Sequence, residues 1–133
     1  MQVLVIPVAN ELYAIPMESV RQVMRRTEVT AVPLSSPELL GAINVRGEVL
    51  PILDTGLLTG NAPVKTVPYT ILVNTDTDLV GLAAEKMPTT AELGEQVGPG
   101  TGPGEKAVHS IGERLVVLID LQELVANHRA RHG

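Results

Sequence analysis

The sequence contains no cysteine among its 133 residues, which excludes disulfide bonds, thiolate metal sites and cysteine nucleophiles. It also lacks phenylalanine and tryptophan, so Tyr13 and Tyr69 are its only aromatic residues. Stacking of nucleic-acid bases or sugars on exposed aromatic rings is therefore not expected. The core has to be built from Val, Leu, Ile and Ala, and such a β-branched composition favours strands.

Charged residues are few and their balance is acidic. They make up 19% of the chain, against 44% hydrophobic residues, which excludes a disordered chain. The net charge of −5 repels phosphate groups, so neither nucleic acid nor an anionic lipid surface is an expected partner. No apolar run approaches the ~20 residues of a membrane-spanning helix. No basic segment precedes the apolar start of the chain, so we expect a cytoplasmic protein with no direct membrane insertion.

Short apolar runs separated by turn residues predict a mostly β protein of one domain, residues 1–133. The continuous run over residues 3–8 indicates a strand that is buried on both faces. Residues 41–54 predict two strands around a tight turn at Arg46-Gly47, where glycine supplies a positive φ. Further strands are expected at residues 12–15, 29–32, 69–73, 79–84 and 114–119.

Two segments have helical patterns. Met17, Val20, Val23 and Met24 follow a helical spacing, and this apolar stripe is either part of the core or an adaptable protein-binding contact. Asp120 is expected to cap a C-terminal helix over residues 121–131, with Glu123 at the third helical position. The Gly/Pro-rich segment 94–106 predicts a surface loop.

The two halves of the chain resemble each other weakly. Residues 49–54 resemble residues 115–120, an offset of 120 − 54 = 66 positions. This repeat predicts two small β subdomains, approximately residues 1–66 and 67–120, which pack on a shared core because each is too small alone. The residues expected to be buried between the halves are Leu53, Ile52, Leu118, Ile119 and Leu121.

The most catalytic-looking motif is Leu53-Asp54-Thr55-Gly56, which resembles the aspartic-protease signature. The alternative function for this chain is therefore a retroviral-type homodimeric protease that uses Asp54. The second half carries Ile119-Asp120-Leu121 instead of a second copy of the motif. Aspartate at the end of a strand is also a common turn former, and this structural interpretation is favoured.

No other pattern assembles a catalytic, metal or cofactor site. In the glycine-rich loop before Lys106, Glu105 separates the last glycine from the lysine, which breaks the phosphate-loop pattern. His128 and His132 have the spacing of a helical metal pair, but no nearby carboxylate completes a site. The sequence therefore predicts no enzyme, no cofactor and no metal.

Residues 41–54 carry the most specific pattern in the chain. They read Gly-Ala-Ile-Asn-Val-Arg-Gly-Glu-Val-Leu-Pro-Ile-Leu-Asp. This run closely resembles the signature Gly-x-x-Asn-hydrophobic-Arg-Gly-x-hydrophobic-x-Pro-x-x-Asp of CheW-like domains, the coupling proteins of bacterial chemotaxis. The similarity extends along nearly the whole chain, from residues 12–16 to residues 115–124.

The resemblance implies an all-β fold of two small five-stranded, SH3-like β-barrels on a shared hydrophobic core, with a short C-terminal helix. It also implies a non-enzymatic adaptor without a cofactor. The implied partners are the regulatory domain of a CheA-type histidine kinase and the cytoplasmic tip of a chemoreceptor. The implied partner-binding residues are Met17, Val20, Gln22, Val45, Arg46, Gly47 and Glu48.

Elementary physics supports Arg46 in this set. An arginine on a rigid two-residue turn loses little entropy on docking, and its fork can hold a carboxylate with two hydrogen bonds. The alternative is a solvated turn arginine without a partner, or one that pairs with an acid such as Glu48 or Asp54 inside the hairpin.

Overall fold

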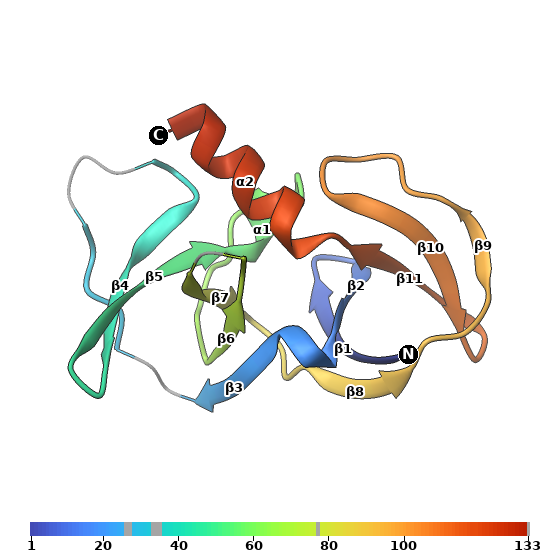
Figure 1. The fold of residues 1–133 in the computed structure, drawn as a ribbon, viewed down its shortest axis with the longest axis horizontal. Helices are drawn as coiled ribbons and strands as arrows, with labels where there is room; N and C mark the ends of the chain where they lie inside the picture. Colours follow the sequence, from blue (N-terminus) through green and yellow to red (C-terminus); the bar gives the residue numbers. More distant parts are fainter. Residues whose placement is uncertain (26–27, 33–35, 77, 133) are drawn as a thin grey trace.

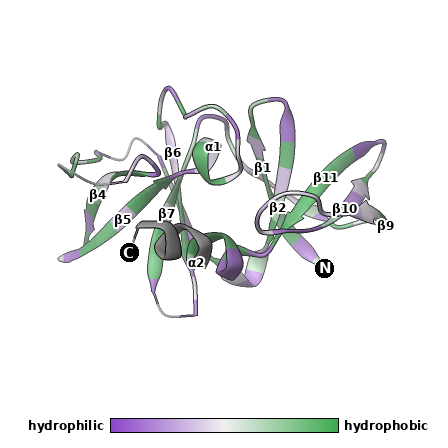
Figure 2. Ribbon diagram, turned by 90° about the horizontal axis from the view of Figure 1, so that it is seen from above, coloured by the Kyte–Doolittle hydropathy of each residue, from purple (hydrophilic) through white to green (hydrophobic). Residues whose placement is uncertain are grey.

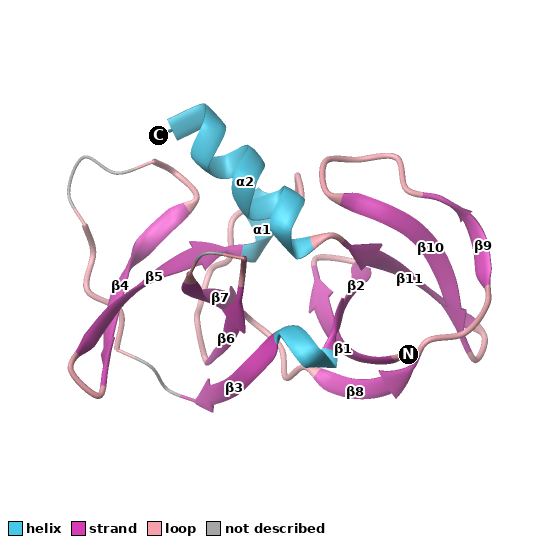
Figure 3. Cartoon of the chain, viewed as in Figure 1, coloured by secondary structure: helices cyan, strands magenta, loops and turns pink. Residues whose placement is uncertain are grey.

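A computed structural model describes residues 1–25, 28–32, 36–76 and 78–132, with side chains described as far as Ala126. Strands dominate it, and the few helices are short (Figure 3). The elements are β1 (Gln2–Val8), β2 (Glu11–Pro16), the 3₁₀ turn η1 (Met17–Ser19), β3 (Val20–Arg25), β4 (Leu39–Val45), β5 (Glu48–Asp54), α1 (Thr55–Leu58), β6 (Tyr69–Asn74), β7 (Leu79–Ala84), β8 (Thr89–Glu92), β9 (Gln96–Pro99), β10 (Glu105–Ile111), β11 (Arg114–Ile119) and α2 (Leu121–His132).

The strands form two sheets that lie side by side, with α2 over their junction (Figure 1). One sheet has six strands in the order β8-β1-β2-β11-β10-β9, and the other has five in the order β3-β6-β7-β5-β4. Seen from above, α1 lies between the sheets, and α2 runs from their junction toward the five-stranded sheet (Figure 2). The predicted two-subdomain β fold is thus confirmed.

The two sheets repeat one plan. Each contains two antiparallel hairpins, β1–β2 with β10–β11 and β6–β7 with β4–β5. One parallel pairing joins the hairpins in each sheet, β2 with β11 and β7 with β5. Five strands therefore correspond in the two sheets, and β9 is an additional edge strand of the larger one.

The fifth corresponding strand of each sheet comes from the neighbouring hairpin. β3 follows β2 in the chain but pairs with β6 in the other sheet, and β8 follows β7 but pairs with β1. The exchange ties the sheets together through backbone hydrogen bonds. At β8 the tie includes the N-terminal amine, which donates to Glu92 Oε1 at 2.8 Å and lowers the pKa of that carboxyl.

This exchange changes the expected division of the chain. The six-stranded sheet takes its strands from residues 2–16 and 89–119, and the five-stranded sheet takes its strands from residues 20–84. The predicted halves 1–66 and 67–120 therefore do not coincide with the two sheets. The repeat itself is real, but its copies are interleaved rather than consecutive.

Three hydrophobic clusters hold the fold together. The largest lies between the sheets and combines residues of β1, β2, β6 and β7 with Leu121, Leu124 and Val125 of α2. Each sheet also curls around a small cluster of its own. Strand β1 serves two clusters, since Leu4 and Ile6 face the shared core while its neighbours face the interior of their sheet. This explains its continuous apolar run.

The residues expected between the halves are all buried, but they divide between clusters. Leu53, Ile119 and Leu121 belong to the shared core, as predicted. Ile52 lies in the interior cluster of the five-stranded sheet and Leu118 in that of the six-stranded sheet. The expectation for these two residues was wrong because side chains alternate along a strand, so neighbours face opposite sides.

The predicted helix over Met17–Met24 is wrong beyond its first turn. Only Met17–Ser19 is helical, and Val20–Arg25 is strand β3. The register of β3 shifts between Val20 and Gln22, which leaves Val20 and Met24 as its two half-buried residues. A spacing of four between apolar residues resembles a helix, although it arises here from an irregular strand.

Two smaller expectations also need correction. The expected strand at residues 29–32 is reduced, over the residues that the structure describes, to an isolated bridge of Thr30 with Ala42. The segment 94–106, expected to be a loop, contains strand β9, whose backbone pairs with β10. Both segments lie at sheet edges, where backbone pairing depends on a neighbouring strand rather than on local sequence.

Candidate functional site

The β4–β5 hairpin ends in a two-residue turn, as the sequence predicted. Val45 and Glu48 form the last strand pair, and Arg46 and Gly47 connect them with φ values of 53° and 85°. Two successive positive φ values match the twist of a tight hairpin. The backbone N–H of Gly47 donates to Asn44 Oδ1 at 2.9 Å, which braces the turn from within.

The tip of this hairpin is open to solvent. Arg46, Gly47 and Glu48 are exposed, and Val49 beside them is 67% exposed. Val45 is half-buried against the interior cluster of the five-stranded sheet. Within the described part of the chain Arg46 forms no ion pair, so the suggested pairing with an acid inside the hairpin does not occur.

The second expected group lies on η1 and β3. Met17 and Val20 are half-buried and pack on the shared core, so this part of the apolar stripe serves the core. Gln22 is exposed on β3 opposite Leu72 of β6. The Arg25 guanidinium lies over the Tyr69 ring, 5.8 Å from its centroid.

The structure does not bring the two groups together through the sheet. β3 and β4 are the two edges of the five-stranded sheet, with β6, β7 and β5 between them. The sheet is curled, however: Thr30 in the segment after β3 bridges to Ala42 of β4, and Met24 of β3 and Val45 of β4 pack against the same cluster. The hairpin tip and the β3 surface are thus two candidate contact regions of one curled sheet.

The sequence did not single out two exposed apolar residues at hairpin turns, one beside Arg46 and the other at the corresponding position of the repeat. Val49 is 67% exposed, and Leu115 in the β10–β11 hairpin is 61% exposed. The two residues are related by the repeat offset, 115 − 49 = 66. The repeat could have marked the two positions as equivalent. Their apolar character alone predicted that both belong to the core.

The Asp54-Thr55-Gly56 motif has a structural role at every position. Asp54 is 1% exposed, and its Oδ1 accepts the N–H of Leu57 at 3.1 Å. Both carboxylate oxygens also accept the N–H of Val64 at 3.2 Å. Thr55 Oγ1 donates to the Ala83 carbonyl at 2.6 Å. Asp54 therefore anchors α1 and the following loop instead of facing a substrate.

Gly56 completes this arrangement by allowing a close approach of two backbone segments. A Cβ atom at this position would lie 1.9 Å from the Ala62 carbonyl oxygen. No larger residue fits there, which explains the glycine without any catalytic role. The protease-like tripeptide is thus a folding element of this corner.

No group of three or more metal-ligating side chains gathers in the described part of the chain. His109 Nδ1, on β10, lies 2.8 Å from the carbonyl oxygen of Gly94 in the segment between β8 and β9. The side chains of His128 and His132 lie outside the described residues. None of the described helices is long and apolar enough to cross a membrane.

A family model described as CheW-like domain matches residues 2–129. The chain belongs to the CheW-like domain family. The resemblance first seen in residues 41–54 is thereby confirmed over nearly the whole chain.

Named relatives support the assignment. A probable chemotaxis protein CheW of Rhizobium etli is 27% identical over 130 residues, which cover 88% of this chain and 82% of that protein. Chemotaxis protein CheW of Klebsiella aerogenes is 24% identical over 139 residues, covering 93% and 81%. The crystal structure of scaffolding protein TtCheW from Thermoanaerobacter tengcongensis has the same fold, with a TM-score of 0.78 at 18% identity over 92% of this chain and 90% of that one.

The structure assigns a physical role to most of the CheW-like signature. A Cβ at Gly41 would lie 2.2 Å from the Thr30 carbonyl oxygen, so this glycine admits the edge segment. Asn44 and Gly47 build the turn, and Asp54 anchors α1. Arg46 is the charged member of the signature that is exposed and has no ion pair in the described chain.

Proposed function

We propose that this CheW-like domain is a non-enzymatic adaptor that couples chemoreceptors to a CheA-type histidine kinase. Membership of the family over residues 2–129 supports an adaptor of chemotaxis signalling. The two named relatives are chemotaxis proteins, and the structural neighbour is a scaffolding protein. The buried and fully engaged Asp54 carboxylate removes the observation on which the protease alternative rested.

The single observation that carries the proposal is that Arg46 is exposed on a rigid turn. Its backbone is held by a braced two-residue turn, while its guanidinium projects from an exposed tip without an internal ion pair in the described chain. Such a side chain adds little to folding. It is preorganised to hold a carboxylate of a partner with two hydrogen bonds.

We infer that the partners are the regulatory domain of the kinase and the cytoplasmic tip of the receptor. The tip residues Val45, Arg46, Gly47 and Glu48 form one contact region, and exposed Val49 adds an apolar surface that can exclude water around the arginine. Gln22 on β3 belongs to the second region, which Met17 and Val20 support from the core side.

Isothermal titration of the chain with each purified partner tests the proposal. Arg46→Ala is expected to weaken binding of at least one partner about tenfold or more, the range for an interface anchor. Arg46→Lys should recover only part of the affinity, because an ammonium cannot bind a carboxylate as a fork. Thermal unfolding of both variants should match the unmodified chain, because Arg46 makes no ion pair in the described structure.

The exposed lysine of β10, Lys106, offers a matched control. Lys106→Ala removes a positive charge from a different sheet and is expected to leave binding unchanged. Equal affinities for the unmodified chain and Arg46→Ala would contradict the role of Arg46. Failure of the unmodified chain to bind either partner would contradict the adaptor function itself.

A further inference from the structure

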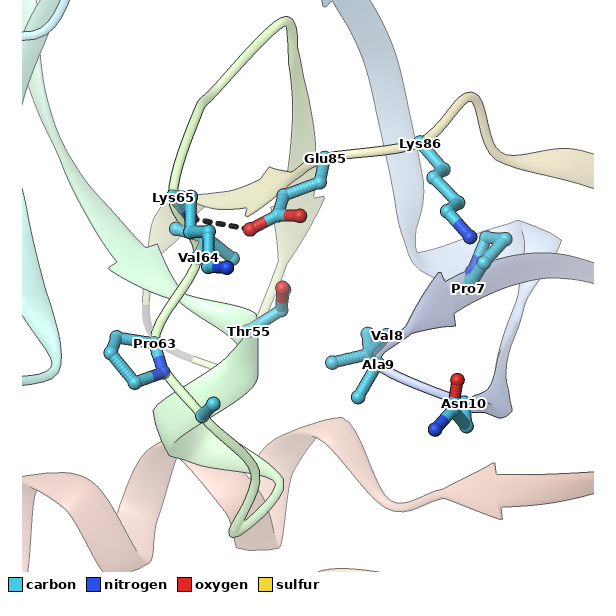
Figure 4. A pocket seen from close by; sticks show the side chains of 11 residues that line it. Pro7, Val8, Ala9, Asn10, Thr55, Pro63, Val64, Lys65, Glu85 and Lys86 are labelled. Carbon is cyan, nitrogen blue, oxygen red and sulfur yellow. Dashed lines mark hydrogen bonds between the residues drawn. The ribbon is translucent and has the colours of Figure 1, made fainter.

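A pocket of about 280 Å³ opens between the two sheets, away from both candidate contact regions. Residues 7–10, which are the end of β1 and the β1–β2 turn, form one wall (Figure 4). Residues 62–65, in the loop after α1, form the other wall together with Glu85 at the end of β7. No residue of the Arg46 turn or of β3 lines it. The pocket is therefore a separate feature made by segments far apart in sequence.

The charge of this pocket is opposite to that of the chain. Two of the three lysines, Lys65 and Lys86, line it in a protein whose net charge is −5. Glu85 is the only acidic residue in the lining, and its Oε1 accepts the backbone N–H of Lys65. The lining side chains therefore carry one net positive charge, which favours a ligand with a single negative charge.

Besides the charged groups, the lining contains the polar side chains of Asn10 and Thr55 and several apolar ones. Pro7 and Val8 line one side, and Pro63 and Val64 line the other. A glutamate side chain matches this arrangement, because its methylene groups can contact the apolar walls while its carboxylate reaches the lysines. A phosphate group fits less well. Its second negative charge would be repelled by Glu85, and no arginine lines the pocket to form a fork.

The corresponding corner in the other half of the repeat has a direct contact between helix and turn. There, Gln122 of α2 accepts the backbone N–H of Asp76 in the β6–β7 turn, so the long helix is bonded directly to the turn. α1 ends after four residues, and the loop that follows it leaves the pocket beside the β1–β2 turn. The repeat thus provides the same corner twice, with α2 bonded to the turn in one copy and a pocket beside the turn in the other.

We propose that this pocket is a third docking site, which takes a glutamate side chain from a protein partner. The identity of the partner rests on the proposed adaptor function, whereas the recognition of a carboxylate rests on the pocket alone. Lys65 and Lys86 bind the carboxylate, and the apolar walls hold its stem. Because the walls come from both sheets, an occupied pocket bridges them.

The first experiment needs no partner protein. The ¹⁵N-labelled chain is titrated with N-acetyl-glutamate α-amide, and N-acetyl-glutamine α-amide is the neutral control of matched shape. Saturable amide shifts at millimolar glutamate probe are expected in residues 8–10 and 64–65 and not with the glutamine probe. They should disappear in the double variant Lys65→Gln with Lys86→Gln and persist in Lys106→Gln. Equal shifts with both probes, or none with glutamate, would overturn the proposal.

The second experiment uses the kinase regulatory domain and the receptor fragment. Charge reversal in Lys65→Glu with Lys86→Glu is expected to weaken one partner about tenfold and to reduce the salt dependence of its binding, while Lys106→Glu changes neither. Loss of binding in Arg46→Ala but not in the lysine variant would overturn the docking site and leave the adaptor function standing. If the unmodified chain binds neither partner, the adaptor function fails and the glutamate titration alone decides the pocket.

Discussion

Two corners of the molecule start from the same local design. At the end of β5, Asp54 Oδ1 accepts the N–H of Leu57 at 3.1 Å as α1 begins. After β11, Asp120 Oδ1 accepts the N–H of Glu123 at 3.0 Å as α2 begins. Asp54 is the last residue of β5 and Asp120 directly follows β11, and each of these strands belongs to a parallel pair. The two aspartates are separated by the repeat offset of 66 residues.

The corners differ in what surrounds the aspartate. Asp54 is 1% exposed and also binds the N–H of Val64, so it holds a helix and a loop at once. Asp120 is half-exposed, and its helix has 12 residues against four in α1. The same aspartate cap is therefore a local feature at Asp120, whereas at Asp54 it is a buried anchor that holds distant segments together.

The largest expected loss of stability comes from the hydrophobic core that both corners share. Leu53→Ala and Ile119→Ala remove corresponding residues of the common core, each about 3% exposed. Each should lower the free energy of unfolding by about 2–5 kcal/mol, because the surrounding strands cannot collapse fully into the space. Urea unfolding followed by circular dichroism measures this loss. The curve should stay a single transition, and two separate transitions would show that the sheets do not depend on one core.

The next largest effect is the difference in stability loss between the two aspartate caps. Asp54→Ala should cost about 2–4 kcal/mol, because two backbone N–H groups lose a buried acceptor. Asp120→Ala should cost about 1 kcal/mol, the usual value of a helix N-cap. Asp54→Asn is the control, since its amide oxygen can still accept one of the bonds. Equal losses for Asp54→Ala and Asp120→Ala in urea unfolding would contradict the buried-anchor role of Asp54.

The smallest effect compares the two hairpin tips. Gly47 and Gly112 have φ values of 85° and 61°, and a Cβ at either position meets nothing within 4 Å. Gly47→Ala and Gly112→Ala should each cost about 1–2 kcal/mol through backbone conformation alone. Arg46→Ala should change stability by less than about 0.5 kcal/mol. Thermal unfolding of the three variants gives the order, and a large loss for Arg46→Ala would make it a structural residue.

Most strands could be predicted from local sequence. The apolar run of β1, the hairpin with its turn at Arg46-Gly47 and the capped start of α2 are all as expected, because each depends on residues close together in the chain. β3 and β9 could not be predicted, since they are strands only through pairing with β6 and β10. For the same reason, no local pattern predicted that β3 and β8 each pair with a strand of the other sheet.

The candidate sites divide in the same way. The position of Arg46 on a tight turn follows from the Arg46-Gly47 pair itself, and the signature around it identified the family. Its freedom from internal ion pairs in the described chain could not be derived, because Asp54 had first to be placed in its buried corner. The lysine pocket had no sequence signal at all, since its walls come from residues 7–10, 62–65 and 85–86.

The sequence by itself determined the β composition, the tight Arg46-Gly47 turn, the repeat and the family, since hydrophobic period, turn chemistry and a fixed motif are properties of neighbouring residues. Only the tertiary structure decided how the two copies interleave, which cluster each strand face enters, and that Asp54 is an anchor rather than a catalyst. It also decided that Lys65 and Lys86 line one pocket. These features depend on contacts between distant segments, and side chains acquire them only when the two sheets close on their shared core.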